Sequence, residues 1–361
     1  MFPIIEVPAN ASRFFDSFEK ALQQPIGKIK ITYDDVEDYY YNSQFDSSLN
    51  LYDSFYYTKD SNQLMNSLKI FYPFVEKYNL LNIIDIGCGQ GEYVQSLNKL
   101  NINATGYDPA LREPTSNLKN EYFDPERTEG KNEETFIMRC VLPHIANPFM
   151  YINALFLRSP KSKIYIEFQR LEWILENKSW ISISHDHVNL FTIKDFQTKY
   201  NIIESGTFSR GEWGFVLFSR AEENHARVNQ NAYSTLDNQL KKLFERRSQQ
   251  LDQLKSINSP ILIYGAAGKG IVFSHAFKSN GGKDIFCIDS DPGRQEKYLE
   301  CSGVKVISPA NALQNFGPDT LVLVMNKNHM EAVNEIFKGS LKIFSLTNFS
   351  SGPGSNSGFS S

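Results

Sequence analysis

The sequence has few cysteines, and their placement excludes a disulfide framework. The four cysteines among the 361 residues are Cys88, Cys140, Cys287 and Cys301; none forms a C-x-x-C pair, and none precedes position 88. Disulfide scaffolds and structural zinc sites depend on closely spaced cysteines. We therefore predict buried or incidental thiols and no zinc site held by cysteines.

The chain also lacks a long block of lysine and arginine and any long apolar run. Its formal net charge is −4, whereas binding to a phosphate backbone needs clustered cations. A membrane-spanning helix needs about 20 consecutive apolar residues, and residues 1–12 contain no basic leader before an apolar core. We expect a cytoplasmic protein that binds a small molecule, with neither nucleic acid nor membrane as a partner.

An apolar run leads through three glycines into a helix-compatible segment. Residues 83–86 include three isoleucines, Gly87, Gly89 and Gly91 follow at alternate positions, and residues 92–100 fit a helix. Glycine permits a positive φ and close approach of a ligand to the backbone, and the helix start offers unpaired N–H groups. The stretch predicts a strand, a turn and a helix around a nucleotide-like cofactor, or else a structural turn without a ligand.

Two acids accompany this loop. Asp85 precedes it directly, and Asp108 ends a second predicted strand, residues 104–108. An acid after the second strand can hydrogen-bond two ribose hydroxyl groups. The glycine spacing, G-x-G-x-G, differs from the G-x-G-x-x-G of dinucleotide sites.

Together these residues resemble the first motif of the class I S-adenosylmethionine-dependent methyltransferases, an apolar strand followed by D-x-G-C-G-x-G. The resemblance implies S-adenosylmethionine as the cofactor. Gly87, Gly89 and Gly91 would lie against its methionine part, and Asp108 would bind its ribose. Asp85 completes the predicted cofactor-binding set.

Strand and helix signals alternate in two parts of the chain, which favours two α/β units. We expect a doubly wound Rossmann-like methyltransferase domain at residues 61–222, a connecting helix at 223–258 and a second Rossmann-like α/β domain at 259–348. An aromatic-rich extension, residues 1–60, precedes them. The Gly/Ser-rich residues 349–361 predict a disordered tail.

Within the extension we predict a short amphipathic helix with Phe14, Phe15, Phe18 and Leu22 on one face. Residues 31–58 are rich in tyrosine among acids and serines. Tyrosines with polar neighbours often line a surface against another domain or a ligand. The segment either wraps the next domain or lines a substrate site.

Two of the six histidines, His185 and His187, lie in residues 182–191, after the predicted strand 163–167. That position corresponds to the carboxyl ends of the strands, where such sheets bind their ligands. Methyl transfer to carbon or oxygen needs a general base, and histidine is the most frequent one. With Asp186 between them, a metal site and a purely structural role stay open, although no third metal ligand is evident.

Several segments also resemble the bacterial sugar C-methyltransferases, over about residues 35–340. The matching segments are Asp38–Ser43, Glu167–Gln169, Trp180, His185–Thr192, Tyr264–Gly270, Asp289–Pro292 with Arg294 and Gln295, and Asn326. Members of that family methylate the carbon next to a ketone in a nucleotide-linked deoxysugar. They hold the sugar between the middle and C-terminal domains.

The resemblance implies that His187 removes the proton α to the carbonyl, with Asp186 beside it. Tyr41 and His185 would lie close by. The residues that it assigns to the nucleotide sugar are Tyr264, Lys269, Arg294 and Asn326, with Lys269 near the phosphates.

The sequence departs from that family near the expected sugar site. The family's N-terminal zinc-binding cysteines are absent, Ser184 replaces a tyrosine, and Met325 replaces a tryptophan. The alternatives are an O- or N-methyltransferase for a related sugar or small molecule, and a non-catalytic protein that binds S-adenosylmethionine. The second glycine turn, residues 265–270, is either a nucleotide site or a Rossmann-like turn that binds no dinucleotide.

Overall fold

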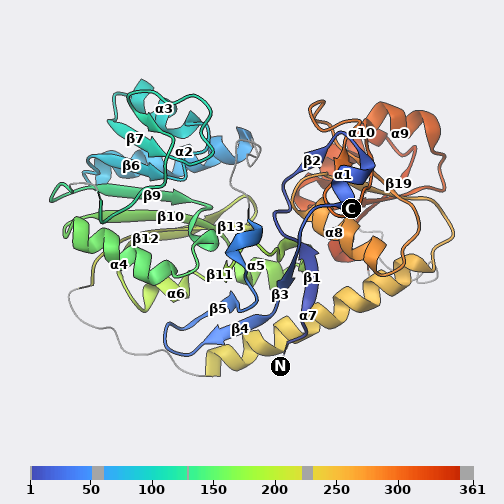
Figure 1. Cartoon of the computed structure of the whole chain (residues 1–361), viewed down its shortest axis with the longest axis horizontal. Coiled ribbons are helices and arrows are strands. Elements are labelled where there is room, and N and C mark those ends of the chain that lie inside the picture. Colours follow the sequence, from blue (N-terminus) through green and yellow to red (C-terminus); the bar gives the residue numbers. More distant parts are fainter. Residues whose placement is uncertain (1, 51–60, 128–129, 222–230, 350–361) are drawn as a thin grey trace.

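Two α/β units are joined by a long helix, α7 (Asn231–Lys255), which runs along both of them (Figure 1). The structure is a computed structural model, and it describes residues 2–50, 61–127, 130–221 and 231–349. Most of the predicted tail, from residue 350 on, and Tyr52, Tyr56 and Tyr57 of the tyrosine-rich segment lie outside the described residues.

The first unit is a seven-stranded sheet in the order β12-β13-β10-β9-β6-β7-β8. Its strands are β6 (Ile83–Ile86), β7 (Ala104–Tyr107), β8 (Leu118–Lys119), β9 (Thr135–Arg139), β10 (Lys163–Gln169), β12 (Asn201–Phe208) and β13 (Trp213–Ser219). The first five run parallel, and β12 and β13 close the sheet as an antiparallel hairpin. The strand order reverses between β6 and β9, where doubly wound sheets bind their ligands.

Helices and apolar side chains cover both faces of this sheet. Its helices are α2 (Ser61–Lys77), α3 (Glu92–Lys99), α4 (Pro148–Arg158), α5 (Leu171–Glu176) and α6 (Lys194–Gln197). Strands buried on both faces read as nearly continuous apolar runs, which explains why β6 and β10 were predictable, whereas the less buried β12 was not predicted.

The second unit is a five-stranded parallel sheet in the order β17-β15-β14-β18-β19. Its strands are β14 (Ile261–Tyr264), β15 (Phe286–Ile288), β17 (Val306–Ile307), β18 (Leu321–Val324) and β19 (Lys342–Ser345), and its helices are α8 (Lys269–Ser279), α9 (Pro309–Asn315) and α10 (Met330–Phe337). The predicted second α/β domain is therefore confirmed as a fold.

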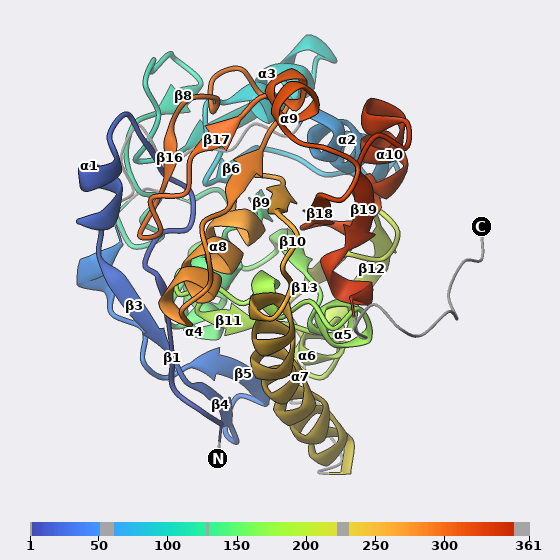
Figure 2. The same ribbon diagram turned by 90° about the vertical axis from the view of Figure 1, so that its right-hand side faces the viewer.

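The N-terminal segment ties the two units together (Figure 2). Its strands are β1 (Ile5–Pro8), β2 (Phe14–Phe15), β3 (Ile26–Ile29), β4 (Ile31–Asp34) and β5 (Tyr39–Asn42). Strand β2 pairs with β16 (Tyr298–Leu299) of the second unit, and β5 pairs with β11 (Asn189–Leu190) of the first. Both pairings are antiparallel, so one segment fixes its position against both units.

The predicted amphipathic helix is confirmed only over residues 18–22, and the inclusion of Phe14 and Phe15 is wrong. Phe14 and Phe15 form β2, and the helix α1 (Phe18–Leu22) begins only after Ser17, whose hydroxyl accepts a hydrogen bond from the Lys20 N–H at 3.3 Å. Phe18 and Leu22 are 45% and 46% exposed. Phe14 and Phe15 pair with β16 as a strand, although the spacing of the apolar residues is also compatible with a helix.

An apolar core joins the two units. Trp180, in a short 3₁₀ turn, packs against Phe273 of α8 with ring centroids 6.1 Å apart, and its indole N–H donates to Gln250 of α7 at 2.7 Å. Buried residues of α5, α7 and α8 belong to the same cluster. Because a buried apolar interface resists relative motion of domains, the walls of a site between the units hold a fixed arrangement.

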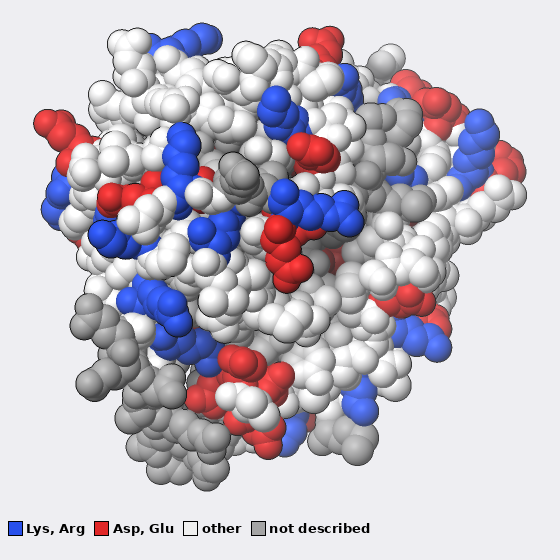
Figure 3. All heavy atoms as spheres, turned by 60° about the vertical axis from the view of Figure 1, so that its left-hand side comes forward, with Lys and Arg blue, Asp and Glu red and all other residues white. Residues whose placement is uncertain are grey.

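Cationic and anionic side chains are interspersed over the face shown in Figure 3. Within the part of the chain that the structure describes, no helix combines the length and apolarity needed to cross a bilayer.

Candidate functional site

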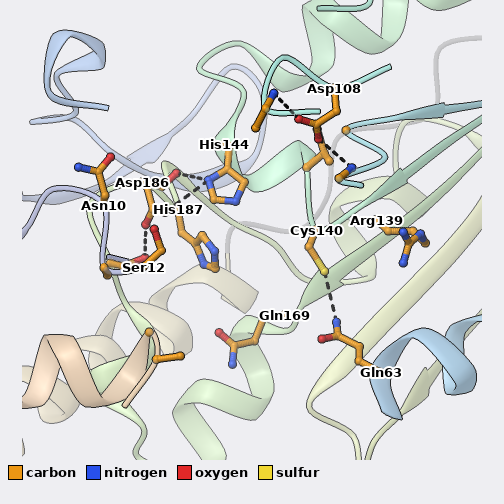
Figure 4. A pocket seen from close by; sticks show the side chains of 18 of the residues that line it. Asn10, Ser12, Gln63, Asp108, Arg139, Cys140, His144, Gln169, Asp186 and His187 are labelled. Atoms are coloured by element: carbon orange, nitrogen blue, oxygen red, sulfur yellow. Dashed lines mark hydrogen bonds and ion pairs between the residues drawn. The ribbon is translucent and has the colours of Figure 1, made fainter. Parts of the chain in front are cut away.

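A cavity of about 700 Å³ lies at the carboxyl ends of β6, β7, β9 and β10 and reaches the start of α8 in the second unit (Figure 4). Residues 10–12 of the N-terminal segment complete its wall. The predicted site residues that line it are Gly87, Gly89, Asp108, Asp186, His187, Lys269 and Asn326. Those that lie outside its lining are Asp85, Gly91, His185, Tyr41, Tyr264 and Arg294.

The first glycine loop adopts the predicted turn. Gly87, Gly89 and Gly91 have φ angles of +72°, +60° and +86°, which side chains rarely tolerate. A Cβ on Gly87 would lie 2.3 Å from Val141, and one on Gly91 would lie 2.4 Å from Leu118. Gly87 and Gly91 therefore allow close packing against Val141 and Leu118.

Asp108 follows β7 and faces the cavity. Its two carboxylate oxygens accept hydrogen bonds from the N–H groups of Gly89 at 2.8 Å and Ala110 at 2.7 Å. A carboxylate has about four lone-pair positions, so each oxygen can accept one more donor. Burial raises the pKa of Asp108, and the two N–H groups oppose that rise.

Asp85 lies under the loop with no exposed surface. Its carboxylate is 3.7 Å from the guanidinium of Arg139, which lines the cavity and lies 4.0 Å from the ring centroid of Tyr93. Burial raises the pKa of Asp85 to about 6, and Arg139 opposes the rise. Asp85 thus contacts the cavity through Arg139.

Two imidazoles lie next to each other in the cavity wall, between the glycine loop and the second unit. The rings of His187 and His144 are 4.7 Å apart in an edge-to-face arrangement. His144 Nδ1 lies 2.7 Å from the main-chain oxygen of Asp186. A carbonyl oxygen only accepts, so Nδ1 carries the proton and Nε2 of a neutral His144 is an acceptor.

His187 is poised as a neutral imidazole. The pKa of His187 is lowered to about 4, mainly by burial and also by the neighbouring His144, whereas Asp186 opposes the shift. A neutral ring with a free lone pair can accept a proton at neutral pH.

His185 and Tyr41 point elsewhere. His185 is fully buried, its Nδ1 lies 3.0 Å from the Lys28 carbonyl oxygen, and its ring packs against Gly27. Tyr41 lies in β5 opposite Asn189. Both residues connect the N-terminal segment to the first unit.

The structure also brings a third possible metal ligand, His144, next to Asp186 and His187; this ligand was not evident from the sequence. The ligand-type atoms of His144, Asp186 and His187 lie within 4.8 Å of one another. Asp186 already accepts a hydrogen bond from Ser184 at 2.7 Å. This engagement favours acid-base chemistry over metal binding, and a chelator distinguishes the two.

Glu212, from the turn between β12 and β13, is the centre of a polar cluster between the units. It is 3% exposed. Four nitrogen donors reach its carboxylate: Gln169 at 2.9 Å, Lys269 at 2.5 Å, Asn326 at 3.1 Å and Asn328 at 2.8 Å. Burial alone would raise the pKa of Glu212, but Lys269 and the hydrogen bonds lower it overall.

Tyr264 and Arg294 surround the acid that follows β15. Arg294 pairs with Asp289 at 3.2 Å and Asp291 at 3.3 Å, and the Tyr264 hydroxyl lies 2.6 Å from Ser290. Asp289 also accepts the N–H of Ala266 at 2.8 Å. The position that would hold a ribose in a dinucleotide fold is therefore occupied by Arg294.

Two family profiles together cover most of the chain. One, described as a methyltransferase domain, matches residues 55–198, and another, described as a C-methyltransferase C-terminal domain, matches residues 214–341. The chain belongs to the S-adenosylmethionine-dependent methyltransferases. S-adenosylmethionine is accordingly the methyl donor of this methyltransferase, as the glycine loop and Asp108 predict.

No curated protein matches the sequence of this methyltransferase. Solved structures similar to part of the chain include the PH0226 protein from Pyrococcus horikoshii OT3, with 14% identity, a TM-score of 0.35, and coverage of 45% of this chain and 93% of that one. The plantazolicin methyltransferase BpumL, in complex with a triazolic desmethylPZN analog and SAH, has 14% identity, a TM-score of 0.35, and coverage of 45% and 87%. The mitomycin 7-O-methyltransferase MmcR has 13% identity, a TM-score of 0.33, and coverage of 45% and 55%.

Several residues that line the methyltransferase cavity were not predicted as site residues from the sequence. Arg139 and Gln169 each end a parallel strand, a position that does favour ligand contact. His144 lies five residues after the end of β9, and Glu212 comes from a hairpin turn. Neither of the last two has a motif around it that would have identified it.

Replacing Glu212 with glutamine should lower the free energy of unfolding by about 2 kcal/mol, because a buried donor loses its charged partner. Since the folded pKa of Glu212 is lowered, its contribution is present above the ordinary glutamate pKa and is lost as the pH falls below it. Urea unfolding at pH 7 and at pH 4 measures both effects.

Glu331→Gln is the matched control, because Glu331 pairs with Arg210 across the same two units at 2.9 Å but is 83% exposed. Exposed pairs contribute little, so this change should be much smaller. Equal destabilisation by the two variants would contradict the role given to Glu212.

Proposed function

We propose that this methyltransferase adds a methyl group to the carbon next to a ketone in a nucleotide-linked deoxysugar, as a step of carbohydrate biosynthesis in the cytoplasm. The match to a C-methyltransferase C-terminal domain supports transfer to carbon. The observation that carries the proposal is the cavity, which runs from Asp108 and the glycine loop, past the two imidazoles, to polar side chains of the second unit. A cavity of about 700 Å³ is within the usual range for small-molecule sites.

His187 is the base in this proposal. When bound, S-adenosylmethionine supplies an electrophilic methyl group on its sulfonium. The neutral His187 removes the proton α to the ketone, and the resulting enolate carbon is the nucleophile. Asp186 stabilises the imidazolium by its charge, and protonation of both rings at once is unfavourable because they lie 4.7 Å apart.

The far wall suits a hydroxylated acceptor. Gln169, Ser182 and Asn326 present amide and hydroxyl groups to the cavity beside the indole of Trp213. Planar polar groups and an aromatic ring are well suited to hydrogen-bond and stack on a sugar. We assign Lys269 and Asn326 to binding of the acceptor. Tyr264 and Arg294 do not line the cavity and instead contact Ser290 and Asp289.

Methylation of oxygen or nitrogen is the second candidate. The same imidazoles would take a proton from a hydroxyl group, and the cavity would admit other small molecules. The third candidate is a protein that binds the cofactor without catalysis. This candidate does not explain the pair of imidazoles in the cavity.

Deuterium exchange distinguishes these candidates. Nucleotide-linked 4-keto-6-deoxysugars carrying uridine, thymidine or guanosine are incubated in D2O with the protein and S-adenosylhomocysteine, which blocks transfer but fills the cofactor site. We expect deuterium at the carbon next to the ketone of one sugar, and none with His187→Gln. Methylated product without such exchange would contradict carbon methylation.

A further inference from the structure

The second glycine turn has the groups of an anion site. Lys269 is the first residue of α8, whose start lines the cavity. Its ammonium and the amides of Asn326 and Asn328, which follow β18, converge on one point between the units. A phosphate of the acceptor is the expected occupant of such a position.

That point is already occupied by the carboxylate of Glu212. Oε1 accepts from Gln169 and Lys269, and Oε2 accepts from Asn326 and Asn328. A carboxylate has about four lone-pair positions, so these four donors saturate it. The Glu212 side chain is 4% exposed and that of Lys269 is 15% exposed, which strengthens the pair relative to one in water.

Three N–H groups of the turn are already bonded within the protein. The N–H of Gly265 bonds to the Ile288 carbonyl at 2.9 Å, and the N–H of Ala266 bonds to Asp289 at 2.8 Å. The N–H of Gly270 bonds to the carbonyl of Ala267 at 2.9 Å. A phosphate-binding loop instead directs its N–H groups at the ligand.

In the first glycine loop, N–H groups are also bonded within the protein. The N–H groups of Gly87 and Gly89 bond to Tyr107 and Asp108, and the cofactor of this loop carries no phosphate. In the loop assigned to S-adenosylmethionine, N–H groups bonded within the protein therefore accompany a ligand without phosphate.

We propose that Glu212 is a built-in counterion that fills the anion position of the second glycine turn, so that the acceptor enters the space between the units with an uncharged part. Glu212 is then a specificity-determining residue: it excludes a phosphate from Lys269 and leaves the sugar hydroxyls to Gln169, Ser182 and Asn326. The exclusion of anions is independent of the reaction. Only the identity of the uncharged part as a sugar rests on the proposed function.

Binding of inorganic pyrophosphate tests this proposal by calorimetry, on protein saturated with S-adenosylhomocysteine. We expect the wild type and Lys269→Met to bind pyrophosphate equally weakly. Glu212→Gln should bind it about tenfold more tightly, the equivalent of one charge-assisted hydrogen bond. Adding Lys269→Met to Glu212→Gln should remove that gain, and Glu331→Gln should behave as the wild type.

Wild-type affinity for pyrophosphate that falls tenfold on Lys269→Met would overturn the proposal, and this comparison holds even if Glu212→Gln fails to fold. Equal affinity of a folded Glu212→Gln and the wild type would also overturn it. Failure of the proposed reaction is seen separately, as absent deuterium exchange with the pyrophosphate pattern unchanged.

Discussion

Replacing His187 with glutamine is expected to slow turnover by about a thousandfold, within the usual contribution of a general base. The amide keeps the polarity and much of the volume of the ring but cannot accept the proton. Affinity for S-adenosylhomocysteine should stay unchanged, because the cofactor is assigned to the glycine loop and Asp108, whereas His187 lies beside His144 and Asp186. Steady-state kinetics with the sugar that shows deuterium exchange, and calorimetry with the cofactor product, measure the two effects.

His329→Gln is the matched control, since that histidine is exposed and does not line the cavity. Treatment with EDTA should leave turnover unchanged; loss of activity that Zn²⁺ or Mn²⁺ restores would instead support a metal on His144, Asp186 and His187. Full activity of a folded His187→Gln would contradict its role as base.

The pH profile gives a second measure of the same residue. Because burial lowers the pKa of His187 to about 4, the ring is neutral at pH 6. Activity is lost only when the base becomes protonated, so kcat/KM should fall as the pH drops through about 4 rather than near the ordinary histidine pKa of about 6.5.

Asp108→Asn is expected to weaken binding of S-adenosylhomocysteine by about a hundredfold. The variant loses the negative charge that can accept two ribose hydroxyl groups, and its amide nitrogen repels the N–H of Gly89 or Ala110. Hydrogen bonds to a charged group contribute about 1.5–3 kcal/mol each, and about 1.4 kcal/mol corresponds to tenfold in affinity. Calorimetric titration measures the loss.

Asp319→Asn serves as its control, because that carboxylate pairs with Lys342 in the second unit and is 86% exposed. Its affinity for the cofactor product should equal that of the wild type. An unchanged affinity in Asp108→Asn would mean that the ribose lies elsewhere.

The cofactor half of the site was predictable because its chemistry is local. Positive φ angles at Gly87, Gly89 and Gly91 require glycine, and a buried parallel strand must precede them. Asp108 follows from the position of the next strand. Each of these signals lies within one strand-turn-helix unit.

The acceptor half was less predictable, because it is assembled from distant parts of the chain. His185 and His187 are two positions apart, yet residues 183–188 form no regular strand, so spacing did not tell which ring faces the cavity. His144 and Glu212 come close to the site only through the packing of the units. Similarity to a family placed Tyr41 near the site, whereas pairing of β5 with β11 keeps it outside the lining.

The most direct test of carbon methylation is the ¹³C NMR spectrum of the product made with S-adenosylmethionine labelled in its methyl carbon. The protein is incubated with the labelled cofactor and the panel of nucleotide-linked keto sugars. We predict a new methyl resonance at the high field typical of a methyl on carbon, coupled to the adjacent sugar carbon when that sugar is also labelled. A resonance at the lower field of an O-methyl or N-methyl group, or none with any sugar, would contradict the account.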